Sequence, residues 1–154
     1  MSVDHRSLID GLVDAMHRAD WDAVVRFYTS DTVMEYPQSG EVFRGITNVR
    51  ATFEKYPGGL DEGRLQTENV IREEPQFAIT PMYTAVAVEG SGTRGTVAFR
   101  ATYPDGSIWW VIMLYELKGD LISRSTEFFA PAFEAPEWRA PYREPATDHG
   151  SAAG

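Results

Sequence analysis

The stretch YPDGSIWWVIMLYELKGDLISRSTEFF, residues Tyr103–Phe129, decides the fold. It holds two long runs rich in β-branched and aromatic residues, and the turn-forming segments PDGS and KGD precede each of them. The run Ile108–Lys118 is apolar at nearly every position, and Leu121–Phe129 follows after the second turn. Together with Thr96–Tyr103 before the first turn, these runs predict three strands of an antiparallel meander.

Hairpin counting places the polar residues of these strands relative to one another. Asp105-Gly106 as a two-residue loop puts Arg100 opposite Val111, and a three-residue loop at KGD puts Val111 opposite Glu127. Arg100 and Glu127 are then on one face, roughly 10 Å apart across the intervening strand. A slip of one residue in either turn would move one of them to the other face.

The residues before the meander have helical periodicity. Apolar residues at spacings of three and four predict helices over Ser2–Ala19, after the N-cap residue Asp20, and around Ile46–Phe53. Further strands are predicted at Thr32–Pro37, Val42–Arg44, Arg64–Arg72 and Phe77–Val88. This order predicts an α+β fold, in which a curved antiparallel sheet wraps around three N-terminal helices as a cone with a pocket.

Composition limits the classes of protein that are possible. The chain has 154 residues, a net charge of -9 and no cysteine. We expect one domain over residues 1–144, followed by a small, polar, disordered tail at 145–154. The acidic balance argues against nucleic acid as a partner. No apolar run reaches the ~18 residues that cross a membrane, and no signal peptide is evident, so we expect a cytoplasmic protein.

Two sequence features imitate functional motifs. GSGTRG, residues Gly90–Gly95, matches the glycine pattern of dinucleotide-binding loops, but a strand follows it where that motif needs a helix. His5 and His17 are too far apart for a helical metal pair, and a surface role is favoured for His17, near the C-terminus of its helix. No metal and no cofactor are therefore predicted.

The strand Ile108–Lys118 is apolar on both faces. Trp110, Ile112 and Leu114 point to one side, while the residues between them point to the other. Helices can cover one face, so the other needs a second cover. We expect a homodimer, with the long C-terminal segment as the alternative cover.

Two longer segments resemble a known superfamily. They are ADWDAVVRFYTSDTVMEYPQSGEVFRGITNVRATFEKYP and YPDGSIWWVIMLYELKGDLISRSTEFFAPAFEAPEWRAPY. Both are similar to the nuclear transport factor 2-like cone, and more closely to its SnoaL-like branch, which includes ketosteroid isomerase, limonene epoxide hydrolase, scytalone dehydratase and polyketide cyclases. The three catalytic positions of ketosteroid isomerase correspond to Tyr36, Leu12 and Val111, so that chemistry is not expected. The EFF run at Glu127 resembles the DYF run of limonene epoxide hydrolase, but the rest of that triad is missing.

The resemblance and the hairpin count both place Glu127 inside the cone. As a carboxylate in an apolar pocket it is the candidate acid or base, with Arg100 to orient it. The other candidate ligand contacts are Leu12, Met16, Glu35, Tyr36, Phe53, Trp109, Val111, Met113 and Tyr115, of which strand parity admits only one of Glu35 and Tyr36. Three hypotheses stay open. They are an acid/base enzyme of the isomerase, cyclase, dehydratase or epoxide hydrolase type acting on a hydrophobic metabolite, a non-catalytic binding module, and a dimerisation module.

Overall fold

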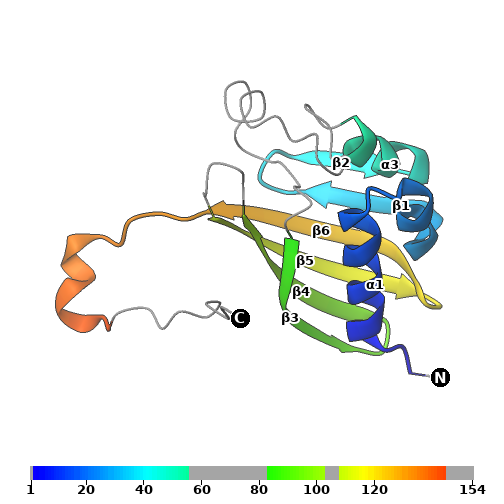
Figure 1. The fold of residues 1–154 in the computed structure, drawn as a ribbon. Helices are drawn as coiled ribbons and strands as arrows, with labels where there is room; N and C mark the ends of the chain where they lie inside the picture. Colours follow the sequence, from blue (N-terminus) through cyan, green and yellow to red (C-terminus); the bar gives the residue numbers. More distant parts are fainter. Residues whose placement is uncertain (1, 56–82, 103–107, 145–154) are drawn as a thin grey trace.

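The computed structural model describes residues 2–55, 83–102 and 108–144 of the chain (Figure 1). Three predicted features lie outside these residues: the strand at Arg64–Arg72, the turn at Asp105-Gly106 and the tail from Pro145. In the part that is described, no helix is both long and apolar enough to cross a membrane.

Two helices precede the first strand, and a third follows the second strand. They are α1 (His5–His17), α2 (Trp21–Val24), which continues as the 3-10 turn η1 (Val25–Phe27), and α3 (Ile46–Glu54). Aspartates begin the first two, since Asp4 accepts a hydrogen bond from the Ser7 amide (3.1 Å) and Asp20 accepts one from the Ala23 amide (3.0 Å). The second helix is shorter than the pattern predicted, because Tyr28 already belongs to the first strand.

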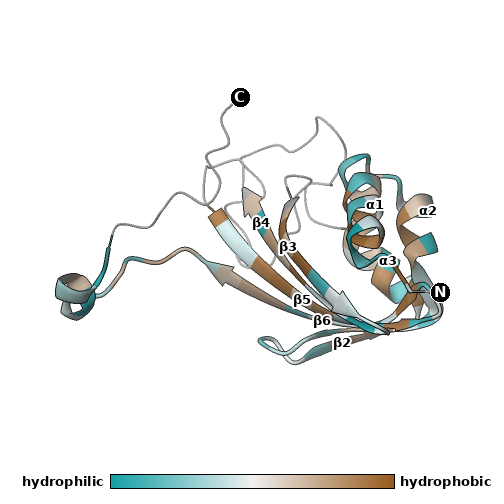
Figure 2. Cartoon of the chain, turned by 90° about the horizontal axis from the view of Figure 1, so that it is seen from below, coloured by the Kyte–Doolittle hydropathy of each residue, from teal (hydrophilic) through white to brown (hydrophobic). Residues whose placement is uncertain are grey.

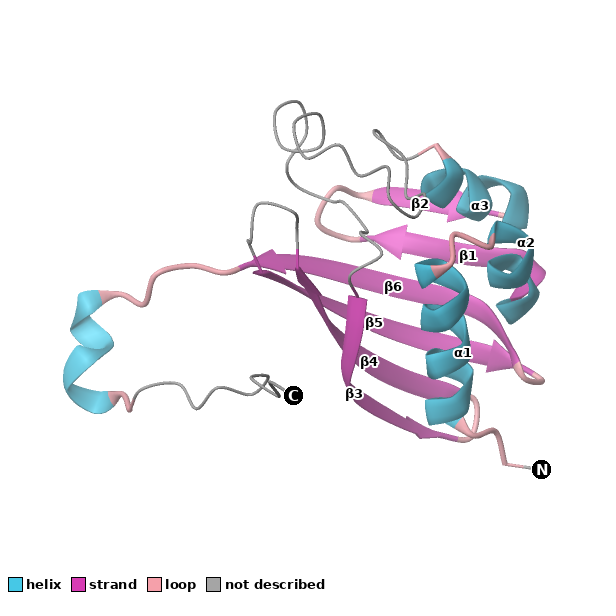
Figure 3. Cartoon of the chain, in the orientation of Figure 1, coloured by secondary structure: helices cyan, strands magenta, loops and turns pink. Residues whose placement is uncertain are grey.

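Six strands form one curved sheet in the order β2-β1-β6-β5-β4-β3 (Figure 3). Their bounds are β1 (Tyr28–Tyr36), β2 (Glu41–Arg44), β3 (Tyr83–Ser91), β4 (Arg94–Thr102), β5 (Ile108–Lys118) and β6 (Leu121–Pro131). The α+β class and the helices on one side of a curved sheet are confirmed. Within that sheet β1 pairs with β6 in parallel, and the other strand pairs are antiparallel.

The strand registers differ from the hairpin count. Arg100 pairs with Trp110, one residue away from the predicted Val111, so the β4–β5 pairing has slipped by one. Glu127 pairs with Met113 instead of Val111, a shift of two that includes an irregularity beside the β5–β6 turn. An odd shift changes the face of a side chain and an even shift keeps it. The side chain of Arg100 therefore lies on the face opposite to the predicted one, while the side chain of Glu127 lies on the predicted face.

The core lies between the helices and the face of the sheet that they cover, here called the inner face (Figure 2). Alternate residues of β5 point into it, and Val111, Met113 and Tyr115 are each no more than 3% exposed. Helices α1 and α3 contribute Ile9, Leu12, Val49 and Phe53. The other apolar residues of β5 point to the opposite face of the sheet, here called the outer face, and are not part of this core.

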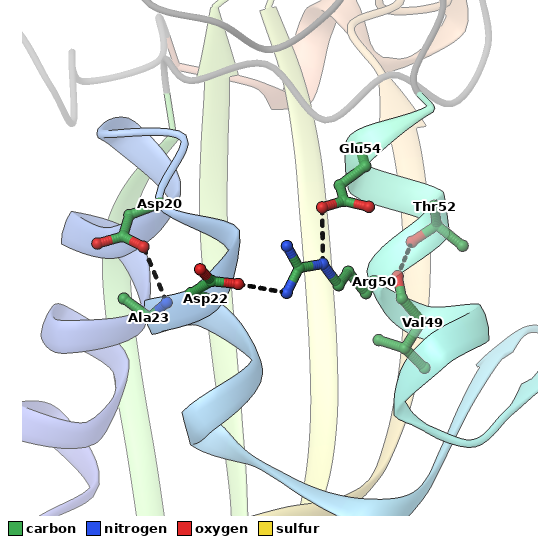
Figure 4. A network of polar contacts seen from close by, with 7 residues as sticks. All are labelled: Asp20, Asp22, Ala23, Val49, Arg50, Thr52 and Glu54. Atoms are coloured by element: carbon green, nitrogen blue, oxygen red, sulfur yellow. Dashed lines mark hydrogen bonds and ion pairs between the residues drawn. The ribbon is translucent and has the colours of Figure 1, made fainter.

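Arg50 on α3 ties α3 to α2 (Figure 4). Its guanidinium donates to Asp22 (2.6 Å) and to Glu54 one turn along α3 (2.6 Å). These ion pairs are largely exposed, so solvent screens them and each adds little to stability. Their main effect is to fix how α2 and α3 sit beside each other over the sheet.

The glycines of GSGTRG serve packing. Gly90 and Gly95 are cross-strand partners on β3 and β4. A Cβ on Gly90 would lie 2.3 Å from the His5 ring, and one on Gly95 would lie 2.2 Å from the Tyr115 ring. Gly92 supplies the positive φ of 58° that the two-residue turn requires.

His5, at the start of α1, is buried. Its Nε2 lies 3.2 Å from the Gly92 carbonyl oxygen and its Nδ1 lies 2.8 Å from the Tyr115 hydroxyl. A carbonyl only accepts, so in the neutral imidazole Nε2 donates to Gly92 and Nδ1 accepts from Tyr115. This chain of two hydrogen bonds fastens the start of α1 to the β3–β4 hairpin. His17, at the other end of the helix, is exposed as expected.

Beyond β6 the chain leaves the domain. Residues 132–144, here called the C-terminal arm, end in the 3-10 helix η2 (Glu137–Tyr142), which stands away from the sheet in all three ribbon views (Figures 1–3). The arm therefore does not cover the outer face of its own sheet, and that alternative for the second cover is wrong for this conformation.

Candidate functional site

An apolar cavity lies between α1, α3 and the inner face of the sheet. It is lined by Leu12, Val13, Met16, Tyr28, Phe53, Phe99, Val111, Met113 and Glu127. Its free volume is about 20 Å³, enough for about one water molecule. Glu127 is the only lining residue of the described chain that has a charged side chain.

Glu127 is 5% exposed and has one polar contact in the described chain, a hydrogen bond from the Ser125 hydroxyl at 3.3 Å. No basic side chain of the described segments forms an ion pair with it. Burial raises the pKa of Glu127 from 4.5 to about 7, and the Ser125 hydrogen bond opposes this only in part. The carboxyl group thus exchanges its proton near neutral pH, which is the property of an acid/base group.

Two buried tyrosines lie near this carboxyl group. Burial, and then the negative charge of Glu127, raise the pKa of Tyr28 and of Tyr36 above the ordinary value, so both phenols stay protonated. Tyr28 lines the cavity itself. Tyr36 sits beside it, edge-on against Phe43 and Phe129 with ring centroids 5.2 Å apart in each pair.

The predicted inward residues divide into two groups. Leu12, Met16, Phe53, Val111, Met113 and Glu127 line the cavity. Trp109, Tyr115 and Tyr36 lie on the inner face but are not among the lining residues, since Tyr115 is held by His5 and Trp109 is only partly buried at the end of β5.

Two predicted site residues are wrong, because both face outward. Arg100 lies on the outer face through the one-residue slip between β4 and β5. Its Nε is buried without a hydrogen-bond partner among the described residues. Glu35 also points outward, where it forms an ion pair with Arg124 on β6. Strand alternation allows only one of Glu35 and Tyr36 to face inward, and in the structure Tyr36 does.

Sequence reasoning missed Tyr28, Phe99 and Val13 as lining residues. Tyr28 begins β1, and the signal for this strand in the sequence is the β-rich run YTSDTVMEY. Phe99 takes the place expected for Arg100, because it pairs with Val111. Val13 lies next to Leu12 on the face of α1 that borders the cavity.

This arrangement favours chemistry that needs only one titrating group. Within the described ranges no three His, Asp or Glu side chains come close enough to hold a metal ion. A single carboxyl group with a pKa near 7 in an apolar cavity can give a proton to a ligand or take one from it. The Tyr28 phenol, which lines the cavity, can donate a hydrogen bond to an oxygen of a ligand there.

Comparisons with known proteins agree with this fold. The family model described as a SnoaL-like domain matches residues 9–125. A comparison with curated protein sequences finds no match. A putative ketosteroid isomerase from Kribbella flavida superposes with a TM-score of 0.72 at 20% identity, over 94% of this chain and 91% of that one. An NTF-2 like protein of unknown function from Burkholderia xenovorans superposes with a TM-score of 0.70 at 22% identity, over 92% and 94%.

A more distant neighbour comes from Catenulispora acidiphila. It is a hypothetical protein with a ketosteroid isomerase-like fold, in complex with trimethylamine, and it superposes with a TM-score of 0.53 at 10% identity over 80% of this chain and 85% of that one. At these identities the structural likeness shows the fold alone.

Proposed function

Since the chain belongs to the SnoaL-like family, we propose that it binds a hydrophobic small molecule in the cavity and that Glu127 exchanges a proton with it. The observation that carries the proposal is a carboxyl group, 5% exposed, with no ion-pair partner in the described chain, at the wall of an apolar cavity. An unpaired buried carboxyl group is costly to a fold. A functional role accounts for its presence.

The chemistry follows from the pKa of about 7. At neutral pH both forms of Glu127 are populated, so one side chain can remove a proton from one atom of the ligand and return it to another. Tyr28 stays protonated and lines the cavity, so its hydroxyl can stabilise charge that develops on a ligand oxygen. Isomerisation, cyclisation, dehydration and water attack on an epoxide all fit this set of groups.

Ligand entry requires side chains to move, because the free volume is only about 20 Å³. Met16 and Met113 line the cavity from opposite sides, one on α1 and one on β5. Methionine is unbranched and changes rotamer easily. These two residues are therefore the ones that should yield to a ligand.

The outward position of Arg100 supports a second candidate, a binding module without catalysis. Arg100, the expected orienting partner of Glu127, faces outward, which leaves the carboxyl group with Ser125 as its one hydrogen-bond partner in the described part of the chain. In that case Glu127 would recognise a polar group of the ligand and no bond would change.

Homodimerisation belongs to the same proposal. On the outer face Trp110, Leu114 and Phe128 are 38%, 44% and 37% exposed, an unusual level for large apolar side chains near the centre of a sheet. A second copy of the chain would cover them. Replacing Ile112, which lies among them, with Arg should split the dimer.

The test uses methyl labels on methionine and a panel of hydrophobic ketones, enones, epoxides and small amines. Amines are included because one structural neighbour holds trimethylamine. Binding is read from the NMR signals of Met16 and Met113, and proton transfer from deuterium uptake by the probe in D2O. We expect shifts at both methionines, and deuterium uptake that Glu127→Gln abolishes while the shifts persist.

Arg100→Gln is the matched control and should preserve both signals, because Arg100 lies on the outer face. Shifts without any deuterium uptake would favour the binding module. No shift with any member of the panel would contradict a ligand cavity at this place.

A further inference from the structure

The C-terminal arm carries three large aromatic side chains that its own domain does not cover. Phe133, Trp138 and Tyr142 are 80%, 72% and 85% exposed. After the Ala132 amide, which donates to the Ile108 carbonyl (3.1 Å), no hydrogen bond or ion pair joins the arm to the described part of the domain. So much exposed aromatic surface on one short segment is typical of a binding element.

The arm also has a defined backbone shape without packing to impose it. Pro131 ends β6, and Pro136 and Pro141 follow within the arm at intervals of five residues; each proline fixes its own φ. The Arg139 amide donates to the Pro136 carbonyl (3.1 Å) within η2, and the Arg139 guanidinium lies 5.6 Å from the Trp138 ring centroid. A segment with few accessible conformations loses little entropy on binding. This favours docking on another surface.

A matching surface lies on the outer face of the same chain. Trp110, Leu114 and Phe128 form an exposed apolar patch there. Beside it is a groove of about 630 Å³, whose walls include Thr96, Leu114 and Thr126. Charged side chains of both signs border this groove, namely Glu89, Arg94, Glu116 and Arg124. The arm likewise carries both signs, with Glu134, Glu137, Arg139, Arg143 and Glu144.

We infer that the C-terminal arm packs on the outer face of a second copy of this chain, with Phe133, Trp138 and Tyr142 as its anchors. A two-fold dimer makes each surface twice, so two arms and two outer faces are covered together. The Arg94–Glu116 pair (3.3 Å) beside the groove and the mixed charges of the arm allow opposite charges to meet at the rim of this contact.

The area involved supports a stable association. A buried aromatic side chain covers 150–250 Å², so the three on one arm, at their observed exposure, amount to roughly 350–600 Å². Two arms contribute about 700–1,200 Å², against the 1,200–2,000 Å² typical of a specific interface. The outer-face patches beneath them supply the remainder.

The experiment measures the mass of the full chain and of truncations by sedimentation. We expect the full chain, 17.2 kDa per copy, to sediment as a dimer, and truncation after Glu144 to leave this unchanged. Truncation after Ala132, or the double variant Trp138→Ser with Tyr142→Ser, should weaken dimerisation at least tenfold. The double variant should fold normally, because both side chains are exposed, and its circular dichroism verifies this.

A second measurement separates docking on a partner from docking on the arm's own sheet. The chain has no cysteine, so any disulfide that forms must involve the introduced cysteines. A mixture of Trp138→Cys and Leu114→Cys chains should give a disulfide between the two chains under mild oxidation. A full-length monomer at every concentration, or a dimer indifferent to loss of the arm, would overturn the inference. So would a disulfide that forms only within one chain carrying both cysteines, or none at all.

Discussion

Replacing Glu127 with Gln should stabilise the protein, and more so at high pH. The amide keeps the shape of the carboxyl group and cannot ionise. In the wild type the folded-state pKa is about 7 against 4.5 for the free group, so the folded state binds the proton more tightly than the unfolded state does. Stability from this group is therefore greatest at low pH and is lost as the pH rises from about 4.5 through 7.

The magnitude follows from that difference in pKa. With one pKa unit equal to 1.36 kcal/mol, ionising the buried group costs about 3 kcal/mol at pH 8 and about 1 kcal/mol at pH 5.5. Glu127→Gln should thus gain about 2 kcal/mol on the wild type between these two pH values, or about 4–8 °C in melting temperature for a chain of this size. Effects of other carboxyl groups cancel, because both proteins share them.

The assay is urea unfolding of both proteins at pH 5.5 and pH 8, which avoids the pI of about 4.7. Glu134→Gln is the matched control, since Glu134 is exposed on the arm and should give the wild-type curve at both pH values. A gap between Glu127→Gln and wild type that is flat across this range would refute the reasoning. A gap of the opposite sign would show that the carboxylate is ionised and paired.

Three further substitutions test the fold around the site. Tyr115→Phe removes the hydroxyl bonded to His5 and should cost about 1–3 kcal/mol in urea unfolding, because a buried ring nitrogen loses its partner. Gly95→Ala places a methyl group 2.2 Å from the Tyr115 ring and should destabilise by about 1–3 kcal/mol, with an unchanged melting curve as the contrary result. Arg100→Gln should leave the NMR titration of the Glu127 carboxyl group unmoved, since the two side chains lie on opposite faces; a clear shift would restore their pairing.

The sequence by itself determined the elements and the character of their surfaces. The helices α1 and α3 follow from the periodicity of their apolar residues, and the strands β5 and β6 from their long apolar runs. Both signals depend only on residues that are near one another in the sequence. The inward position of Glu127 could also be predicted from the sequence, because the predicted register was wrong by two residues, which keeps the side chain on the same face. The two-sided apolarity of β5 likewise signalled that the outer face needs a cover.

Only the tertiary structure decided which polar groups meet. Arg100 lies outside the site because the pairing of β4 with β5 is shifted by one residue from the predicted register. The residues of a turn do not determine a strand register to within one residue. The parallel pairing of β1 with β6 joins residues about ninety positions apart, and no local pattern encodes such a contact. The burial of His5 depends on the space left by Gly90 and on the hydroxyl of Tyr115, which the folded sheet alone brings to the start of α1.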